Sequence, residues 1–154
     1  YGVMFAPNQA QAAKEMLRVC KSGGMIGMAN WTPKGFIGQV FKTLGRHVPP
    51  PAGVASPALW GTEDWIKQHF GEQAREVTVT PKDFVFRYKS PAHFMQIFRD
   101  YYGPVHKAFL ALGDPAKQEA LTADLTATIA SFDKSTDGSM RVPSAYSEIV
   151  ITKA

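Results

Sequence analysis

The side chains best placed for chemistry lie at the ends of two short apolar runs. Residues 1–5 form the first run, and residues 25–29 form the second, which leads into Asn30 and Trp31. Each run is typical of a strand, and open α/β sheets bind ligands outside the carboxyl ends of their strands. The same side chains are also typical of a core, so both interpretations stay open. The candidate binding residues at the two ends are Met4, Phe5, Asn30 and Trp31.

Aromatic side chains form a second set of candidates. They have the size and character that line an apolar cavity for a small molecule. Aromatic residues at helical spacing are also typical of a hydrophobic core. Neighbouring helix positions point about 100° apart, so Tyr101 and Tyr102 are both buried only if their helix is covered on two sides. The set consists of Phe36, Phe86, Tyr88, Phe94, Phe98, Tyr101 and Tyr102.

Other kinds of active site find little support in the sequence. The four histidines have no metal-ligand spacing such as H-E-x-x-H, so no metal site is predicted. No serine lies in a G-x-S-x-G turn, so no Ser-His-Asp triad is predicted either. The histidines are His47, His69, His93 and His106.

Composition indicates one soluble domain spanning residues 1–154, with 45% hydrophobic and 19% charged residues. No apolar run approaches the roughly 20 residues that cross a bilayer, so no membrane association is expected. A single cysteine, Cys20, excludes an internal disulfide and fits a reducing, cytoplasmic compartment. The net charge of +4 comes from scattered lysines and arginines, which does not favour nucleic acid as a partner.

The first half of the chain has a clear αβ pattern. Apolar residues recur at helical spacing within 8–21, and Gly23 and Gly24 then turn the chain. The run at 25–30 follows at once and reads as a strand buried on both faces. We expect this strand to be central in its sheet, with the helix beside it.

The rest of the chain is predicted to alternate helices and strands. Thr32 and Pro33 are a typical helix start, and a proline-rich connection covers 49–57. The remaining predicted elements are a helix from Thr62 to Gly71, strands at 75–80 and 84–88 separated by Pro81–Asp83, helices within 91–132 and a closing strand at 146–151. This order predicts an α/β fold with a helical insert at about 91–132.

Residues 1–31 carry a resemblance to a known family. The segments YGVMFAPNQ and LRVCKSGG, followed by the strand, resemble class I S-adenosylmethionine-dependent methyltransferases of the ubiquinone/menaquinone-biosynthesis type. In that family a helix closes with an (L/M)-x-R-V-L-K-P-G-G run; Cys20 replaces its second Leu and Ser22 its Pro. The resemblance implies the carboxyl-terminal half of a Rossmann-like methyltransferase sheet. That sheet would be mixed, with the last strand antiparallel between its neighbours.

The resemblance also implies roles for the candidate residues. Met4, Phe5 and Asn30 would bind the cofactor, S-adenosylmethionine. Trp31, Phe36, Phe86, Phe98, Tyr101 and Tyr102 would bind a small apolar or aromatic methyl acceptor under the cover formed by 91–132. The family's glycine-rich loop and its acidic ribose and adenine ligands have no counterpart here. This truncated chain is therefore expected to be the acceptor-binding half of a small-molecule methyltransferase, without cofactor or activity on its own.

Two alternatives remain. One is a non-catalytic module that binds small molecules or associates with itself. A homo-oligomer, such as a homodimer, is expected in either case, because an incomplete sheet leaves an apolar strand edge. The second alternative is a fragment of a nucleic-acid methyltransferase, suggested only by a pI of about 9.2.

Overall fold

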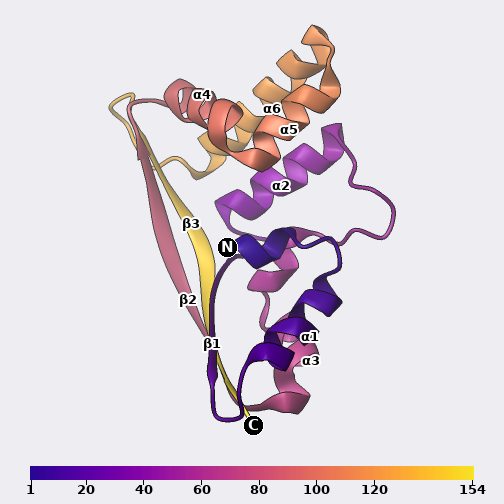
Figure 1. The fold of residues 1–154 in the computed structure, drawn as a ribbon. Helices are drawn as coiled ribbons and strands as arrows, with labels where there is room; N and C mark the ends of the chain where they lie inside the picture. Colours follow the sequence, from indigo (N-terminus) through magenta and orange to yellow (C-terminus); the bar gives the residue numbers. More distant parts are fainter. The chain divides into compact units, whose positions relative to one another are not determined.

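The computed structural model describes residues 1–154 and contains three strands, β1 (Met25–Trp31), β2 (Ala74–Tyr88) and β3 (Met140–Lys153). They form one sheet in the order β1-β3-β2, so the last strand lies between the other two (Figure 1). Strand β3 is antiparallel to β1, with Met25 opposite Thr152 and Trp31 opposite Tyr146. The α/β class is thereby confirmed. Within this chain the sheet is antiparallel and not mixed, because residues 1–5 add no strand.

Six α-helices and three 3-10 helices accompany the sheet. The α-helices are α1 (Gln9–Val19), α2 (Phe36–His47), α3 (Glu63–Phe70), α4 (Pro91–Tyr101), α5 (Gly103–Leu112) and α6 (Pro115–Phe132). The 3-10 helices are η1 (Gly2–Phe5), η2 (Pro57–Gly61) and η3 (Gly71–Gln73). Side chains of Asn8, Ser90 and Asp114 accept backbone N–H groups at the starts of α1, α4 and α6. These caps satisfy donors that have no partner inside the helix.

Residues 1–5 correct the first strand prediction. They form the 3-10 helix η1, in which the Ala6 N–H donates to the Val3 carbonyl at 3.1 Å. The prediction was wrong because a short apolar run without alternation is compatible with either a strand or a helical turn.

Strand β1 has the predicted position in the sequence but lies at an edge of the sheet and not at its centre. Ile26 is buried as expected, whereas Met25 is 73% exposed. The strand is therefore not buried on both faces along its whole length. Its carboxyl end, at Asn30 and Trp31, is the fully covered part.

Strand β2 continues through Pro81–Asp83, where an interruption was predicted. A proline is tolerated in an edge strand because part of the backbone there has no neighbour to donate to. Lys82 also pairs with Glu148 of β3 at 3.3 Å. Strand β3 is longer than the predicted 146–151, and helix α2 begins at Phe36, three residues after the predicted start at Pro33.

The chain divides into two compact units. The first comprises residues 1–35, 52–83 and 145–154. In it α1 packs against α3, and Figure 1 shows both on the same side of the strands. The Lys153 ammonium donates to the carbonyls of Leu17 and Cys20 at 2.8 and 2.9 Å, where a cation complements the end of α1. Its core is built from Met4, Ala13, Leu17, Ile26, Trp60, Ile66, Phe70, Ile149 and Ile151.

The second unit comprises residues 36–51 and 84–144. Helix α2 packs on α5 and α6, and α4 packs on the same two helices. The predicted insert at 91–132 thus matches α4, α5 and α6 in its boundaries. No helix of the chain has both the length and the apolar character to span a membrane. The core of this unit includes Phe36, Ile37, Val40, Phe94, Phe109, Leu121, Leu125, Ile129 and Val142.

Candidate functional site

The carboxyl end of β1 carries the most unusual polar group of the first unit, the side chain of Asn30. This residue is completely buried, and its Nδ2 donates to the Trp60 carbonyl at 3.2 Å. Its Oδ1 is buried without a hydrogen-bond partner, as is the indole Nε1 of Trp60. A buried polar atom without a partner costs free energy, which makes these two atoms unusual within the first unit.

Trp31 covers the same strand end. Its ring stacks on Tyr1 with centroids 4.3 Å apart, and Tyr146 meets it edge-on at 6.1 Å. Burial, and secondarily the neighbouring Tyr146, raises the pKa of the Tyr1 phenol. The phenol is therefore protonated at physiological pH.

Helix η2 approaches the strand end very closely. A Cβ atom on Gly61 would lie 2.7 Å from the Trp31 carbonyl carbon, so no other side chain fits there without movement. The Ser147 hydroxyl fixes this approach by donating to the Gly61 carbonyl at 2.7 Å. We call the group the strand-end cluster: Tyr1, Met4, Asn30, Trp31, Trp60, Tyr146 and Ser147.

The predicted residues Met4 and Phe5 have different surroundings. Met4 is buried in η1, and η1 and β1 both contact η2. The structure thus brings Met4 into the strand-end cluster with Asn30 and Trp31. Phe5 is 44% exposed.

Four of the predicted acceptor-binding residues meet in the second unit, Phe36, Phe86, Phe98 and Tyr102. Phe36 packs against Phe86 at 5.9 Å, and Phe86 packs against Phe98 at 5.8 Å. These separations are those of packed aromatic side chains. We call this group the aromatic cluster: Phe36, Phe86, Tyr88, Phe94, Phe98, Tyr102 and Phe132.

The two adjacent tyrosines are separated by the helix geometry. Tyr102 packs on Phe98 at 4.7 Å, and its hydroxyl is buried without a partner. Burial raises the pKa of the Tyr102 phenol far above its usual range. Tyr101 is 80% exposed and lies outside the aromatic cluster. Only one of the pair is therefore covered.

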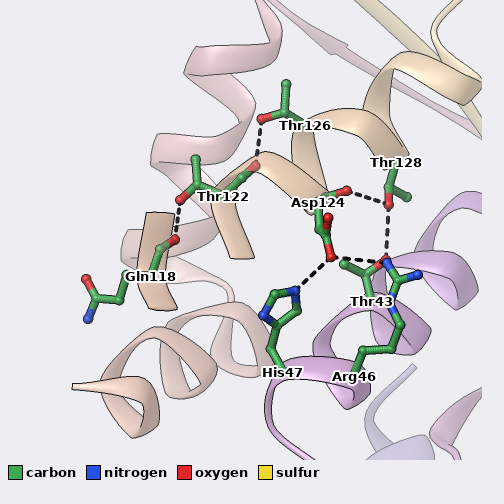
Figure 2. Close-up of polar contacts among 8 residues, drawn as sticks. All are labelled: Thr43, Arg46, His47, Gln118, Thr122, Asp124, Thr126 and Thr128. Atoms are coloured by element: carbon green, nitrogen blue, oxygen red, sulfur yellow. Dashed lines mark hydrogen bonds and ion pairs between the residues drawn. The ribbon is translucent and has the colours of Figure 1, made fainter. Parts of the chain in front are cut away.

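A polar network joins α2 and α6 within the second unit (Figure 2). The His47 ring Nε2 lies 2.8 Å from Asp124 Oδ2, and Arg46 reaches the same oxygen at 3.5 Å. The hydroxyls of Thr43 and Thr128 bond to each other at 3.0 Å. A His–Asp pair can orient a general base. The hydroxyls nearest to it are already bonded, so the network serves to fix the two helices together.

Some members of the strand-end cluster were not predicted. Tyr146 and Ser147 lie in the predicted closing strand but were not predicted to reach the end of β1, and no local periodicity marks Trp60. Trp60 follows a proline-rich connection, and a lone large aromatic residue in such a context is the only available signal. No three His, Cys, Asp or Glu side chains gather in an arrangement suited to a metal ion.

Comparison with known proteins finds relatives in mycobacteria. The chain is 34% identical over 128 residues to the uncharacterized protein Rv1403c of Mycobacterium tuberculosis, covering 81% of this chain and 47% of that protein. It is 35% identical over 117 residues to the uncharacterized protein Rv1405c of the same species, covering 75% and 43%. The uncharacterized protein Mb1438c of Mycobacterium bovis is 34% identical over 128 residues. The chain spans about half the length of these curated relatives. No protein-family model matches it.

Proposed function

We propose that this chain forms the acceptor-binding half of a small-molecule methyltransferase that uses S-adenosylmethionine. The strand order is the observation that carries the proposal. The resemblance of residues 1–31 implies a last strand that runs antiparallel between its two predecessors. The chain has the order β1-β3-β2, with β3 antiparallel to β1. This order supports the proposal that the three strands form the carboxyl-terminal half of a Rossmann-like methyltransferase sheet.

The residues of the strand-end cluster fit one part of the cofactor. The free carboxamide oxygen of Asn30 is a buried acceptor, which suits an N–H donor such as the amino group of the methionine moiety. Met4 and Phe5 are the proposed apolar neighbours. When bound, S-adenosylmethionine supplies the methyl group. The ribose and adenine have no acidic partner at a strand end of this chain, so we expect the chain alone to bind the cofactor weakly.

For the methyl acceptor, the chain offers apolar side chains and one buried hydrogen-bond donor, the Tyr102 hydroxyl. Phe36, Phe86, Phe98 and Tyr102, which all belong to the second unit, remain the proposed acceptor-binding residues. Tyr101 is 80% exposed and Trp31 belongs to the first unit, so neither is kept in this proposal. Because its pKa is raised, Tyr102 stays protonated and donates a hydrogen bond to a carbonyl or hydroxyl oxygen. Holding the acceptor oriented is a sufficient role for this half, since methyl transfer is strongly accelerated by positioning.

Acceptor binding tests this proposal directly. Isothermal titration calorimetry would follow the binding of quinone-like and phenolic compounds to the chain and to two variants. Tyr102→Phe should weaken the binding of an oxygen-bearing acceptor about five- to tenfold, since it removes one buried hydrogen bond. Tyr101→Phe is the matched control and should leave the affinity unchanged, because that side chain is exposed. Absence of saturable binding, or equal effects of the two variants, would contradict the proposal.

A second candidate is a self-associating module without catalysis. The observation in its favour is the edge position of β1, which pairs with β3 alone, together with the exposed Met25. Edge strands with apolar side chains recruit a second chain. We expect light scattering at micromolar concentration to show dimers or larger species. Met25→Lys should shift them toward monomer, because a lysine on an edge strand opposes pairing. A monomer at every concentration would remove this candidate.

A further inference from the structure

The second unit has a surface hollow of about 630 Å³, a size that suits a small ligand. We call it the basic hollow. It is formed by the end of β2, the first turn of α4 and the connection between α6 and β3. Its lining residues include Arg87, Lys89, His93, Lys134, Asp137 and Arg141.

Charge is the first unusual property of this hollow. Four lysines and arginines line it, against one carboxylate, that of Asp137. Cations and anions are nearly balanced over the whole chain, with 17 and 13 residues. The local excess is therefore much larger than the average.

The four cations also have no acidic partner. The ion pairs of the chain involve other residues, and the Arg141 guanidinium donates only to the Lys134 carbonyl, at 3.1 Å. Like charges that share a concave surface repel each other, and a bound anion would relieve that repulsion.

The Asp137 carboxylate already accepts hydrogen bonds from its own turn. Asp137 Oδ1 accepts the Ser139 N–H at 3.0 Å and the Ser135 hydroxyl at 2.7 Å. Hydrogen bonds, chiefly from Ser139, hold the pKa of the Asp137 carboxyl well below its usual range. Asp137 therefore stabilises the turn and stays ionised, so it offsets one of the four positive charges and the lining keeps a clear positive excess.

The wall of the hollow is held in place before any ligand binds. Asp133 Oδ1 accepts the N–H groups of Ser135 and Arg141, both at 2.9 Å, and the Lys134 N–H donates to the Arg141 carbonyl at 2.9 Å. Binding to a pre-formed site loses less conformational entropy. On the opposite wall His93 has a buried ring nitrogen, Nδ1, without a hydrogen-bond partner.

From these observations we propose that the basic hollow binds a small molecule with at least two negative charges on phosphate or carboxylate oxygens. The arginine forks match the geometry of such oxyanions, and the lysines supply further charge. Thr136 lines the same hollow and offers a hydroxyl group. The Ser135 hydroxyl is already bonded to Asp137 and to the Ser139 hydroxyl. This site is separate from the residues proposed for methyl transfer and does not depend on that function.

Titration calorimetry and amide chemical-shift mapping test the proposal on the whole chain. The probes are inorganic phosphate, pyrophosphate and citrate, which separate phosphate from carboxylate sources, and a short DNA duplex. We expect pyrophosphate or citrate to bind saturably and more tightly than phosphate. The amide shifts should concentrate at residues 87–93 and 134–141, and the affinity should fall with added salt.

Matched charge removals locate the binding. Lys89→Gln and Lys134→Gln should each weaken binding about five- to tenfold, the loss expected for one charge-assisted contact. Lys117→Gln removes the same charge from an exposed position on α6 outside the hollow and should have almost no effect. Equal losses in all three variants, or no saturable binding by any small anion, would overturn the proposal. Tighter binding of the DNA duplex than of every small anion would overturn it as well.

Discussion

Asn30 is a polar residue without solvent access whose donor is bonded and whose acceptor is not. Its place at the end of a strand was predictable from the sequence, because the apolar run stops there. Its partner Trp60 was not predictable, since it lies 30 residues away beyond a connection without periodicity. Single residues can therefore be assigned to a site from local pattern, whereas their partners depend on the tertiary fold.

Asn30→Asp should strongly destabilise the first unit. The carboxylate would lose the donor to the Trp60 carbonyl and add a buried charge next to it. We expect the free energy of unfolding to fall by about 3 kcal/mol. Urea denaturation at neutral pH measures this change in the free energy of unfolding.

Asn8→Asp is the matched control for that substitution. Asn8 is exposed and only accepts a hydrogen bond at the start of α1, which aspartate does equally well. Its free energy of unfolding should change by less than about 0.5 kcal/mol. Similar losses in the two variants would mean that the surroundings of Asn30 differ from those described here.

The pair formed by His47 and Asp124 gives a second prediction at this scale. A double-mutant cycle with His47→Ala and Asp124→Ala should show a coupling free energy of about 1 kcal/mol at pH 6, since the pair is half-buried and close. The exposed pair of Lys67 and Glu63 should couple less strongly. Zero coupling at His47 would show that the network of Figure 2 does not fix the two helices together.

At the scale of elements, three helix starts agree with local residue type, whereas Thr32 and Pro33 lie before the start of α2 at Phe36. Asn8, Ser90 and Asp114 are polar residues just before apolar periodic segments, and each caps a helix as its residue type predicts. Residues 1–5 and Pro81–Asp83 were predicted wrongly. In both places the outcome depends on neighbouring strands, or on their absence, which local sequence does not encode.

The close approach of η2 to β1 is tested by a pair of glycine substitutions. Gly61→Ala would place a methyl group against the Trp31 carbonyl, where backbone atoms on both sides must move. We expect a loss of about 2 kcal/mol or more in the free energy of unfolding. Thermal or urea unfolding gives this value.

Gly45→Ala is the control, since nothing lies within 4 Å of the added Cβ atom in the interior of α2. It should stabilise the protein by about 0.5–1 kcal/mol, because alanine loses less entropy in a helix. If Gly61→Ala were equally harmless, η2 would not lie against β1 as described.

At the scale of the whole molecule, the strand order links the sequence to the proposed function. The resemblance rests on residues 1–31, and the proposed function also draws on the position of β3, which begins at residue 140. An antiparallel last strand between its predecessors was predictable only through the resemblance, because spacing along the chain does not give strand order. The curated relatives are about twice as long as the aligned segment, so we expect their remaining half to supply the cofactor ligands.

The proposed methyltransferase function is tested by titrating S-adenosylmethionine into two proteins, this chain and the full-length Rv1403c of Mycobacterium tuberculosis. We expect the relative to bind the cofactor with a Kd of about 1–100 μM and this chain alone to give no measurable binding at those concentrations. The difference would reflect directed hydrogen bonds to the ribose and adenine, each contributing about 1 kcal/mol. Failure of the relative to bind S-adenosylmethionine, or micromolar binding by this chain alone, would rule out the proposed division of the cofactor site.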